Sequence, residues 1–255
     1  MAVIAPFRRL PSATLLIVLL LLWEAFARFV LPTYEPMASL VLPPPSAGVI
    51  DGYELLIRGT LLPQVIASAR RVYGGFLAAA IVGIPLGAAM GLSPRVLRQM
   101  TPIVEIIRPI PPVAWIPITL LWFGITDTQQ YFIIFIGTIF PLVLSTIAGI
   151  QGIEPILTRA ALSLGADRRT LFLLMLRGAL PSILLGVRIS LGLAWFIVVA
   201  SEMVSASRGL GYLIIQARTA MVTERVYVGM FAIGLIGFAQ DRFLVWFERK
   251  LVPWA

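Results

Sequence analysis

The stretch YFIIFIGTIFPLVLSTIAGI, residues 131–150, carries no charged side chain. A helix of about 20 mostly apolar residues is long enough to cross the hydrocarbon core of a bilayer. The rest of the chain agrees, because 59% of its 255 residues are hydrophobic and 13% are charged, whereas a soluble domain carries about 25% charged residues. The sequence therefore predicts an all-α, polytopic integral membrane protein.

Five further apolar segments predict a total of six transmembrane helices. They lie at approximately 13–31, 72–92, 102–123, 183–201 and 226–247. The first has an alternative interpretation as a cleaved signal peptide, because Arg8 and Arg9 precede it and the run 25–27 reads Ala-Phe-Ala. Its length and the spans that follow favour a retained helix that tolerates Glu24 and Arg28, four residues apart.

The span at 102–123 is unusual because it is rich in proline. The prolines are Pro102, Pro109, Pro111, Pro112 and Pro117. Such a helix must be broken or kinked, and broken helices in membranes occur inside protein or beside a cavity. Glu105 and Arg108 are three residues apart, so they are expected to pair on one helix face, or else to line a transport pathway.

Two connections stand out between these spans. Residues 32–66 predict an outer loop that leads into a short surface helix near 55–70. Residues 151–182 form the longest polar-containing connection in the second half. We therefore expect a first helix with an outer linker over 1–60, followed by a five-helix core over 61–250. Gly83, Gly87 and Gly91 recur every four residues and predict close helix contact, or else a surface that slides during transport.

The basic residues predict the orientation in the membrane. With the N-terminus in the cytoplasm, thirteen of the 20 basic residues lie at the inner side, although Arg70 and Arg71 lie outside. The thirteen are Arg8, Arg9, Arg95, Arg98, Arg108, Arg159, Arg168, Arg169, Arg177, Arg188, Arg242, Arg249 and Lys250. The formal charge of +8 then lies on one face and signals orientation. The sequence contains no run of more than two consecutive basic residues, so the charge does not indicate a nucleic-acid partner.

Missing residue types exclude several kinds of chemistry. The chain has no His and no Cys, which excludes His/Cys metal sites, disulfides, Ser-His-Asp triads and cysteine nucleophiles. A Walker A loop needs Gly-Lys followed by Ser or Thr, but the lone lysine, Lys250, precedes Leu251. We therefore expect no catalytic, cofactor-binding or metal-binding residues in this chain.

The connection TRAALSLGADRRTLFLLMLRGALP, residues 158–181, predicts a helix–turn–helix at the membrane surface. Gly165 breaks the first helix, a second helix covers 168–176, and Pro181 stands just before span five. Small side chains would let a partner approach, and two arginines would face solvent, a partner or lipid phosphate. These residues are Ala160, Ala161, Gly165, Ala166, Arg168 and Arg169. The alternative is an amphipathic helix resting on the bilayer.

This segment resembles the coupling loop of ATP-binding cassette (ABC) importer permeases, E-A-A-x3-G-x9-I-x-L-P. The match runs through Arg159-Ala160-Ala161, Leu164-Gly165-Ala166 and Met175. Arginine replaces the family's glutamate at 159, and Arg177-Gly178 replaces its Leu-Pro pair. Leu180-Pro181 resembles a second Leu-Pro pair of the nitrate/sulfonate/taurine/bicarbonate branch.

Other segments resemble the same branch, in order, over about 40–250. They are Val41–Ser46, Gly83–Gly87, Gly91–Ser93, Arg108–Pro112, Ile116-Pro117, Leu121–Ile125, Leu193–Trp195, Ala200–Met203 and Gly209–Ile214.

The resemblance implies a type I ABC importer transmembrane domain in a bacterial inner membrane. A second permease copy, two ATPase subunits docked on residues 159–170, and a periplasmic or lipid-anchored solute-binding protein would complete it. ATP hydrolysis would then belong to a separate chain.

Candidates for the translocation path are Glu105, Arg108, Trp115, Trp122 and Glu202. Glu202 could instead be an exposed outer-loop acid, and the tryptophans could be packing residues. Arginines and helix N-termini freed at the prolines would attract small oxyanions such as nitrate, bicarbonate or sulfonates. Alternatives are an uncharged heterocycle such as a thiamin precursor, an ion-coupled secondary transporter, or a membrane enzyme. The sequence shows neither the repeat of one half in the other that a secondary transporter would have nor the group of catalytic residues that an enzyme would need.

Overall fold

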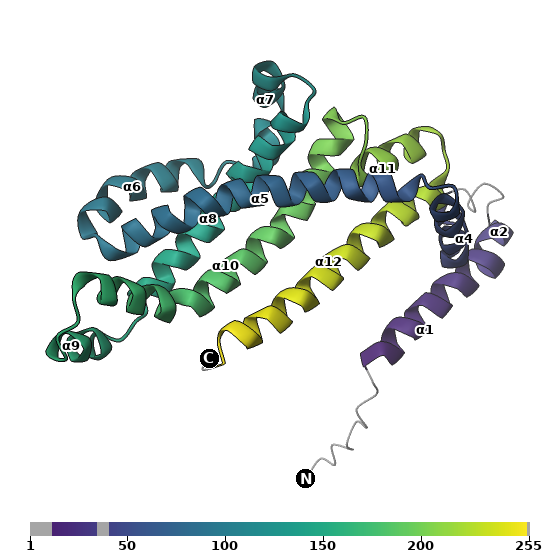
Figure 1. Ribbon diagram of the computed structural model, residues 1–255. Helices are drawn as coiled ribbons and strands as arrows, with labels where there is room; N and C mark the ends of the chain where they lie inside the picture. Colours follow the sequence, from purple (N-terminus) through teal and green to yellow (C-terminus); the bar gives the residue numbers. More distant parts are fainter. Residues whose placement is uncertain (1–11, 35–40, 254–255) are drawn as a thin grey trace, which may run out of the picture. The chain divides into compact units, whose positions relative to one another are not determined.

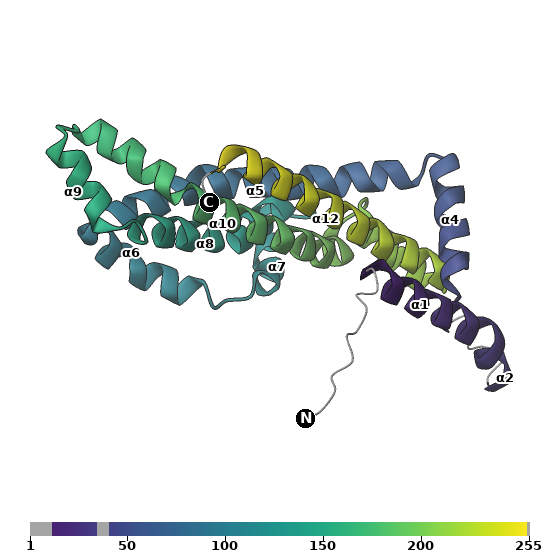
Figure 2. The same ribbon diagram turned by 90° about the horizontal axis from the view of Figure 1, so that it is seen from below.

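The computed structural model describes residues 12–34 and 41–253, which form helices and connecting turns without a β-strand (Figures 1 and 2). The predicted basic N-terminal segment with Arg8 and Arg9 lies outside these residues. The helices are α1 (Ser12–Ala25), η1 (Phe26–Val30), α2 (Leu31–Tyr34), α4 (Pro45–Ile57), α5 (Leu61–Leu92), α6 (Pro94–Ile107), η2 (Pro112–Trp115), α7 (Ile116–Phe123), α8 (Asp127–Gln151), α9 (Pro155–Ser163), α10 (Arg168–Ser205), α11 (Leu210–Thr219) and α12 (Thr223–Leu251).

Within the described residues, five helical stretches are long and apolar enough to cross a membrane: 14–33, α5, α8, α10 and α12. The pair formed by 94–107 and 112–123 also qualifies when taken together, but it is bent by 80° (Figure 1). The all-α, polytopic architecture is therefore confirmed, and so is the break in the proline-rich span.

The chain divides into two compact units, one comprising 1–63 with 213–232 and the other 64–212 with 233–255. In the first unit, Glu24 accepts hydrogen bonds from the backbone N–H (3.0 Å) and hydroxyl (2.8 Å) of Ser46 at the start of α4. Arg28 lies 2.5 Å from the same carboxylate. This explains how an apolar first helix carries two charges, since each neutralises the other.

The second unit is built around α8, which packs against two long helices. A Cβ added at Gly87 would lie 2.7 Å from the Cβ of Thr146, and one added at Gly91 would lie 3.0 Å from the Cβ of Ile150 farther along α8. The glycine stripe of α5 therefore makes the predicted close helix contact. Ser190 of α10 donates to the carbonyl of Thr138 across the other face of α8.

The order of these contacts shows that α5 and α8 run parallel. Gly74 faces Tyr131 and Gly91 faces Ile150. The end of α5 therefore lies beside the end of α8, while Asp127 at the start of α8 pairs with Arg71. The chain must travel back over the length of helix from 71 to 92, about 30 Å at 1.5 Å per residue. The bent pair makes this return within the unit and, taken as one span, is the sixth candidate crossing.

Two predicted boundaries are wrong. No surface helix covers 55–70, because α4 ends at Ile57 and α5 already begins at Leu61, with Gly59 at φ +67° between them. Arg70 and Arg71 thus lie inside the helix, and Arg71 is buried among acceptors that satisfy its charge.

The second helix of the 158–181 segment and span five are also not separate. They form one 38-residue helix, α10, and Pro181 lies in its interior. A proline removes one backbone hydrogen bond, and membrane helices tolerate this loss. At about 57 Å, α10 is longer than the ~30 Å hydrocarbon core, so one end must extend beyond it.

Candidate functional site

The segment between α9 and α10 is a tight turn held by backbone hydrogen bonds. The N–H groups of Gly165 and Ala166 donate to the carbonyls of Leu162 and Ala161, both at 3.0 Å. Gly165 has φ +81°, a conformation that glycine adopts without strain. Asp167 then caps α10 by accepting from the Thr170 N–H at 2.9 Å. The predicted helix–turn–helix is therefore present.

This helix–turn–helix is exposed in the isolated chain. It lies at an extremity of the second unit in both ribbon views (Figures 1 and 2). No residue of α9 is buried, and the Leu164 side chain is 89% exposed. The other predicted coupling residues are exposed (Arg159, Ala160, Gly165, Arg168 and Arg169) or half-buried (Ala161 and Ala166). Leu180 and Pro181 lie apart from them, half-buried about 18 Å along α10.

Asp167 lies outside the membrane-spanning helices and holds the first turn of α10. The hydroxyl of Thr170 donates to its carboxylate, and so does the Thr170 backbone N–H. These hydrogen bonds lower the pKa of Asp167, because they stabilise the ionised form. The α10 cap therefore remains charged at neutral pH.

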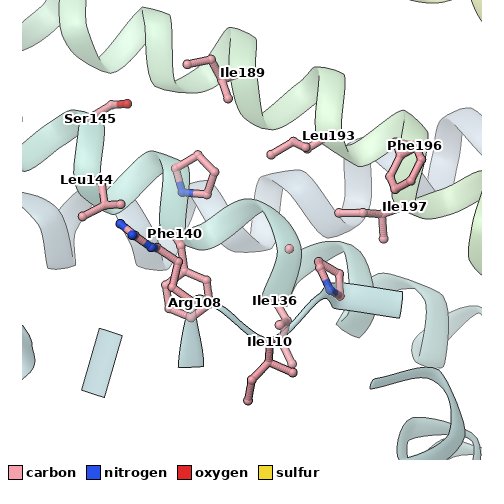
Figure 3. A pocket seen from close by; sticks show the side chains of 13 residues that line it. Arg108, Ile110, Ile136, Phe140, Leu144, Ser145, Ile189, Leu193, Phe196 and Ile197 are labelled. Atoms are coloured by element: carbon pink, nitrogen blue, oxygen red, sulfur yellow. The ribbon is translucent and has the colours of Figure 1, made fainter. Parts of the chain in front are cut away.

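The break in the third span opens one side of a pocket of about 480 Å³ (Figure 3). Helix α6 ends at Ile107, and the chain resumes as η2 at Pro112. The lining residues come from this break, α8 and α10: Arg108, Ile110, Pro112, Ile136, Gly137, Phe140, Pro141, Leu144, Ser145, Ile189, Leu193, Phe196 and Ile197. Arg108 and Ser145 supply the polar side chains of an otherwise apolar lining.

The predicted ion pair between Glu105 and Arg108 does not form. Among the described residues, no carboxylate oxygen lies within 4.0 Å of the Arg108 guanidinium, and Glu105 is exposed outside the pocket. The backbone does not prevent the pair, since Arg108 is the C-cap residue of α6 and keeps a helical conformation, with its N–H bonded to the Val104 carbonyl at 2.9 Å. The side chain of Arg108 lines the pocket instead.

The two tryptophans proposed for the path lie outside this pocket. Trp122 is 55% exposed and packs edge-on against Phe123 and Phe132. Trp115 is half-buried, and its indole Nε1 has no hydrogen-bond partner among the described residues. The structure thus brings neither of them together with Arg108.

Glu202 is not an exposed loop acid, since only 1% of its surface is accessible. Its carboxylate lies 2.8 Å from the guanidinium of Arg71 and accepts hydrogen bonds from the Ser68 hydroxyl and the Gly211 N–H. A charge can be buried when it is both paired and hydrogen-bonded, as Glu202 is here.

Arg71 extends this cluster beyond Glu202. It also bonds to Asp127 at the start of α8 (2.7 Å) and to the carbonyl of Arg208 (2.5 Å). Sequence reasoning did not identify Arg71, Ser68 or Asp127 as members of one site. The one local signal was an arginine pair at the expected edge of a span. The cluster ties α5, α8, α10 and the turn before α11 together.

The structure shows no group of three or more His, Cys, Asp or Glu side chains among the described residues that could hold a metal ion.

Comparisons with known proteins agree with this architecture. The family model described as binding-protein-dependent transport system inner membrane component matches residues 79–253. The taurine transport system permease protein TauC of Escherichia coli is 38% identical over 245 residues, which cover 94% of this chain and 87% of TauC. A putative ABC transporter permease of Methanocaldococcus jannaschii is 40% identical, with coverages of 91% and 87%. The nitrate import permease protein NrtB of Synechococcus elongatus is 34% identical, with coverages of 74% and 70%.

A solved structure supports the fold. The chain resembles one in the inward-facing MetNI methionine ABC transporter with a TM-score of 0.62 and 19% identity, over 76% of this chain and 97% of that chain. Together with the family match over 79–253, these findings show that the chain belongs to the binding-protein-dependent transport system inner membrane component family, as a membrane permease subunit of an ABC importer whose ATPase is a separate chain.

Proposed function

We propose that two copies of this chain form the translocation path of an importer for a small anion. The proposed substrates resemble nitrate, a sulfonate, taurine or bicarbonate, because the relatives are named for taurine, aliphatic sulfonate and nitrate transport. A solute-binding protein delivers the anion, and two ATPase subunits power its release into the cell. The complex sits in a bacterial inner membrane with the N-terminus in the cytoplasm.

The exposed helix–turn–helix at 155–169 carries the proposal. It stands at the end of a helix too long for the bilayer, and its turn presents small residues that a partner can approach closely. The ATPase contact comprises Arg159, Ala160, Ala161, Leu164, Gly165, Ala166, Arg168 and Arg169, supported by Leu180 and Pro181. Residues 61–250 form the transport core, within which the family match begins at 79.

The proposed path residues contribute differently. Arg108 lines the pocket at the broken span. Glu105, Trp115 and Trp122 lie on the bent pair itself but outside the pocket. Glu202 holds α5 and α10 together through Arg71. We therefore assign direct contact with the anion to Arg108 and an indirect role in the path to the other four.

Co-purification and uptake test this function. The backbone at position 165 has a positive φ, and a β-branched residue such as valine adopts that conformation only with strain. We expect Gly165→Val to lose the ATPase during purification and to lose ATP-driven uptake in proteoliposomes. Gly59→Val is the matched control, because Gly59 also has a positive φ and open space around it.

The alternatives give different results in the same assay. Uptake driven by an ion gradient without ATP would identify a secondary transporter and overturn the proposal. ATP-driven uptake of an uncharged heterocycle, with no uptake of any anion, would overturn the proposed substrate class.

A further inference from the structure

The pocket at the broken span has a polar end and an apolar end. In Figure 3, Arg108, Leu144 and Ser145 lie at one end, and Phe196 and Ile197 lie at the other. We propose that this pocket binds an amphipathic monoanion inside the permease, with an oxyanion head on Arg108 and Ser145 and an apolar body along α8 and α10. The inference rests on the proposed function, and it narrows the transported anion to an organic sulfonate or carboxylate.

The first step is that Arg108 lacks an internal partner. In spanning helices, Arg71 and Arg188 each lie within 4.0 Å of a carboxylate, whereas Arg70 on α5 makes no ion pair among the described residues. In the described part of the chain, no ion pair or hydrogen bond is made by the side chain of Arg108. The carboxyl end of α6 supplies only about half an elementary charge to oppose it. The Arg108 side chain is exposed in the isolated chain, so its guanidinium is open to an anion that enters the pocket. An unpaired charge within a membrane is costly, and an anion at this position would remove that cost.

The second step is the chemistry of the polar end. A guanidinium presents a planar fork of N–H groups that matches the oxygens of a carboxylate or sulfonate. Ser145 on α8 is half-buried, and its hydroxyl has no hydrogen-bond partner within the described structure. Two donors without partners thus face the same end of one pocket (Figure 3).

The third step is the shape and lining of the rest of the pocket. From Gly137 to Ser145 the pocket follows α8 for about 12 Å, at 1.5 Å per residue. A four-atom inorganic anion occupies a volume on the order of one water molecule, about 30 Å³, and would leave most of the 480 Å³ unfilled. An apolar body would cover the isoleucine, leucine and phenylalanine walls.

The lining also disfavours a zwitterion. It contains no Asp or Glu, so an ammonium group beside the oxyanion would lose its hydration without gaining a partner. The site therefore prefers a head with a single negative charge and an uncharged tail.

The absence of cysteine from the chain allows a direct test. An Ile189→Cys variant places a single thiol in the pocket wall and leaves Arg108 and Ser145 intact. The full-length chain, in membrane vesicles of zwitterionic lipid, is treated with a negatively charged methanethiosulfonate reagent. We expect 1-hexanesulfonate at about ten times its Kd to slow modification about tenfold, and nitrate at the same concentration to leave the rate unchanged.

Further variants assign the effect to Arg108. Protection should disappear in Arg108→Gln and persist in Arg98→Gln, which removes the same charge from α6 outside the pocket. Protection that survives in Arg108→Gln, equal protection by nitrate, or no protection would overturn the proposal. A thiol that reacts only after denaturation would do so too. A last outcome concerns lipid. If the thiol reacts slowly in vesicles of anionic lipid even without hexanesulfonate, and adding hexanesulfonate does not change that rate, lipid headgroups occupy the pocket and the proposal is overturned.

This measurement is independent of ATP. If the wild-type complex takes up no anion with ATP, the proposed function is wrong. The rate of thiol modification would still show whether the pocket binds hexanesulfonate.

Discussion

At the scale of single residues, burial decides what Glu202 does. Its carboxylate is closed off from solvent, and its neutralising partner, Arg71, is 131 residues away in the sequence. Removing one member of a buried ion pair leaves the other charge without compensation, which costs about 3–5 kcal/mol. The pair is therefore expected to contribute more to stability than the exposed ion pairs among the described residues, such as Arg58–Glu54.

We predict that Arg71→Ala lowers the free energy of unfolding by about 3–5 kcal/mol. Asp127→Ala is the control, because it removes another partner of Arg71 whose side chain is 47% exposed, and such pairs contribute about 0–1 kcal/mol. Thermal unfolding of the two purified variants in detergent compares them. Equal losses would show that Glu202 does not depend on Arg71.

Gly209, in the turn before α11, gives a second prediction at this scale, with Gly124 at the end of α7 for comparison. Gly209 and Gly124 both have a positive φ in regions that other residues rarely adopt, so alanine at either position costs about 1–3 kcal/mol in backbone strain. A Cβ at Gly209 would in addition collide with the Glu202 carboxylate, whereas nothing lies within 4 Å at Gly124. Gly209→Ala should therefore unfold at a clearly lower temperature than Gly124→Ala. The reverse order would contradict the packing of this turn.

The sequence could not have revealed this cluster. Local patterns place Glu202 near the end of a hydrophobic run and Arg71 near the start of another, and both positions are compatible with solvent. Only the antiparallel packing of α5 against α10 brings Ser68, Arg71 and Glu202 together. Contacts of this range carry no signal in helix periodicity or composition.

At the scale of helices, prolines end a helix at 109–112 but are tolerated inside a helix at position 181. The prolines from 109 to 112 ended α6 and produced the 80° bend, as predicted. Pro181 did not start a helix, and α10 runs through it. Several prolines within four residues remove successive backbone donors, whereas one proline removes a single hydrogen bond that an otherwise regular helix can lose. The number of neighbouring prolines was therefore the informative feature.

The contact of α5 with α8 gives a prediction about close packing. A Cβ at Gly87 would lie 2.7 Å from both the Thr146 Cβ and the Val143 carbonyl oxygen, so the two helices would have to separate. Overpacking of this kind costs about 1–3 kcal/mol. We expect Gly87→Ala to lower the unfolding temperature in detergent. Gly192→Ala on α10 should not lower it, because no atom lies within 4 Å there. Similar behaviour of both variants would contradict the glycine-mediated contact.

The cap of α10 gives a prediction about pH. Hydrogen bonds from Thr170 lower the pKa of Asp167, so the cap's contribution is present above the ordinary carboxyl range near 4 and is lost only as the pH falls below it. Amide exchange at Thr170 should accelerate in Asp167→Ala, and less so in Asp167→Asn, which keeps an acceptor. After correction for the intrinsic exchange rate, protection should be constant between pH 5 and 8. A loss of protection within that range would contradict the lowered pKa.

At the scale of the whole molecule, the parallel run of α5 and α8 favours six crossings over five. Two parallel helices can follow one another in a chain only if the segment between them returns across the membrane. Composition predicted that return as a span at 102–123, and the structure divides it into α6, η2 and α7. Five of the six predicted spans are continuous candidate helices in the structure, and the sixth depends on the bent pair being one crossing. The shape of the third span was not predictable, because it depends on where the chain leaves a helix beside a pocket.

The cysteine-free chain makes this topology measurable with single thiols at three exposed positions. Arg58→Cys reports the connection before α5, Ile125→Cys the turn between α7 and α8, and Leu164→Cys the turn between α9 and α10. If the bent pair crosses the membrane, two crossings separate 58 from 125 and one separates 125 from 164. With the N-terminus in the cytoplasm, a membrane-impermeant thiol reagent applied to intact cells should label Arg58→Cys and Ile125→Cys, and should label Leu164→Cys only in inverted vesicles. If the bent pair instead re-entered on one side, Ile125→Cys would be protected in intact cells and Leu164→Cys would be labelled there. That pattern would move the helix–turn–helix at 155–169 to the outer face, where no ATPase could reach it.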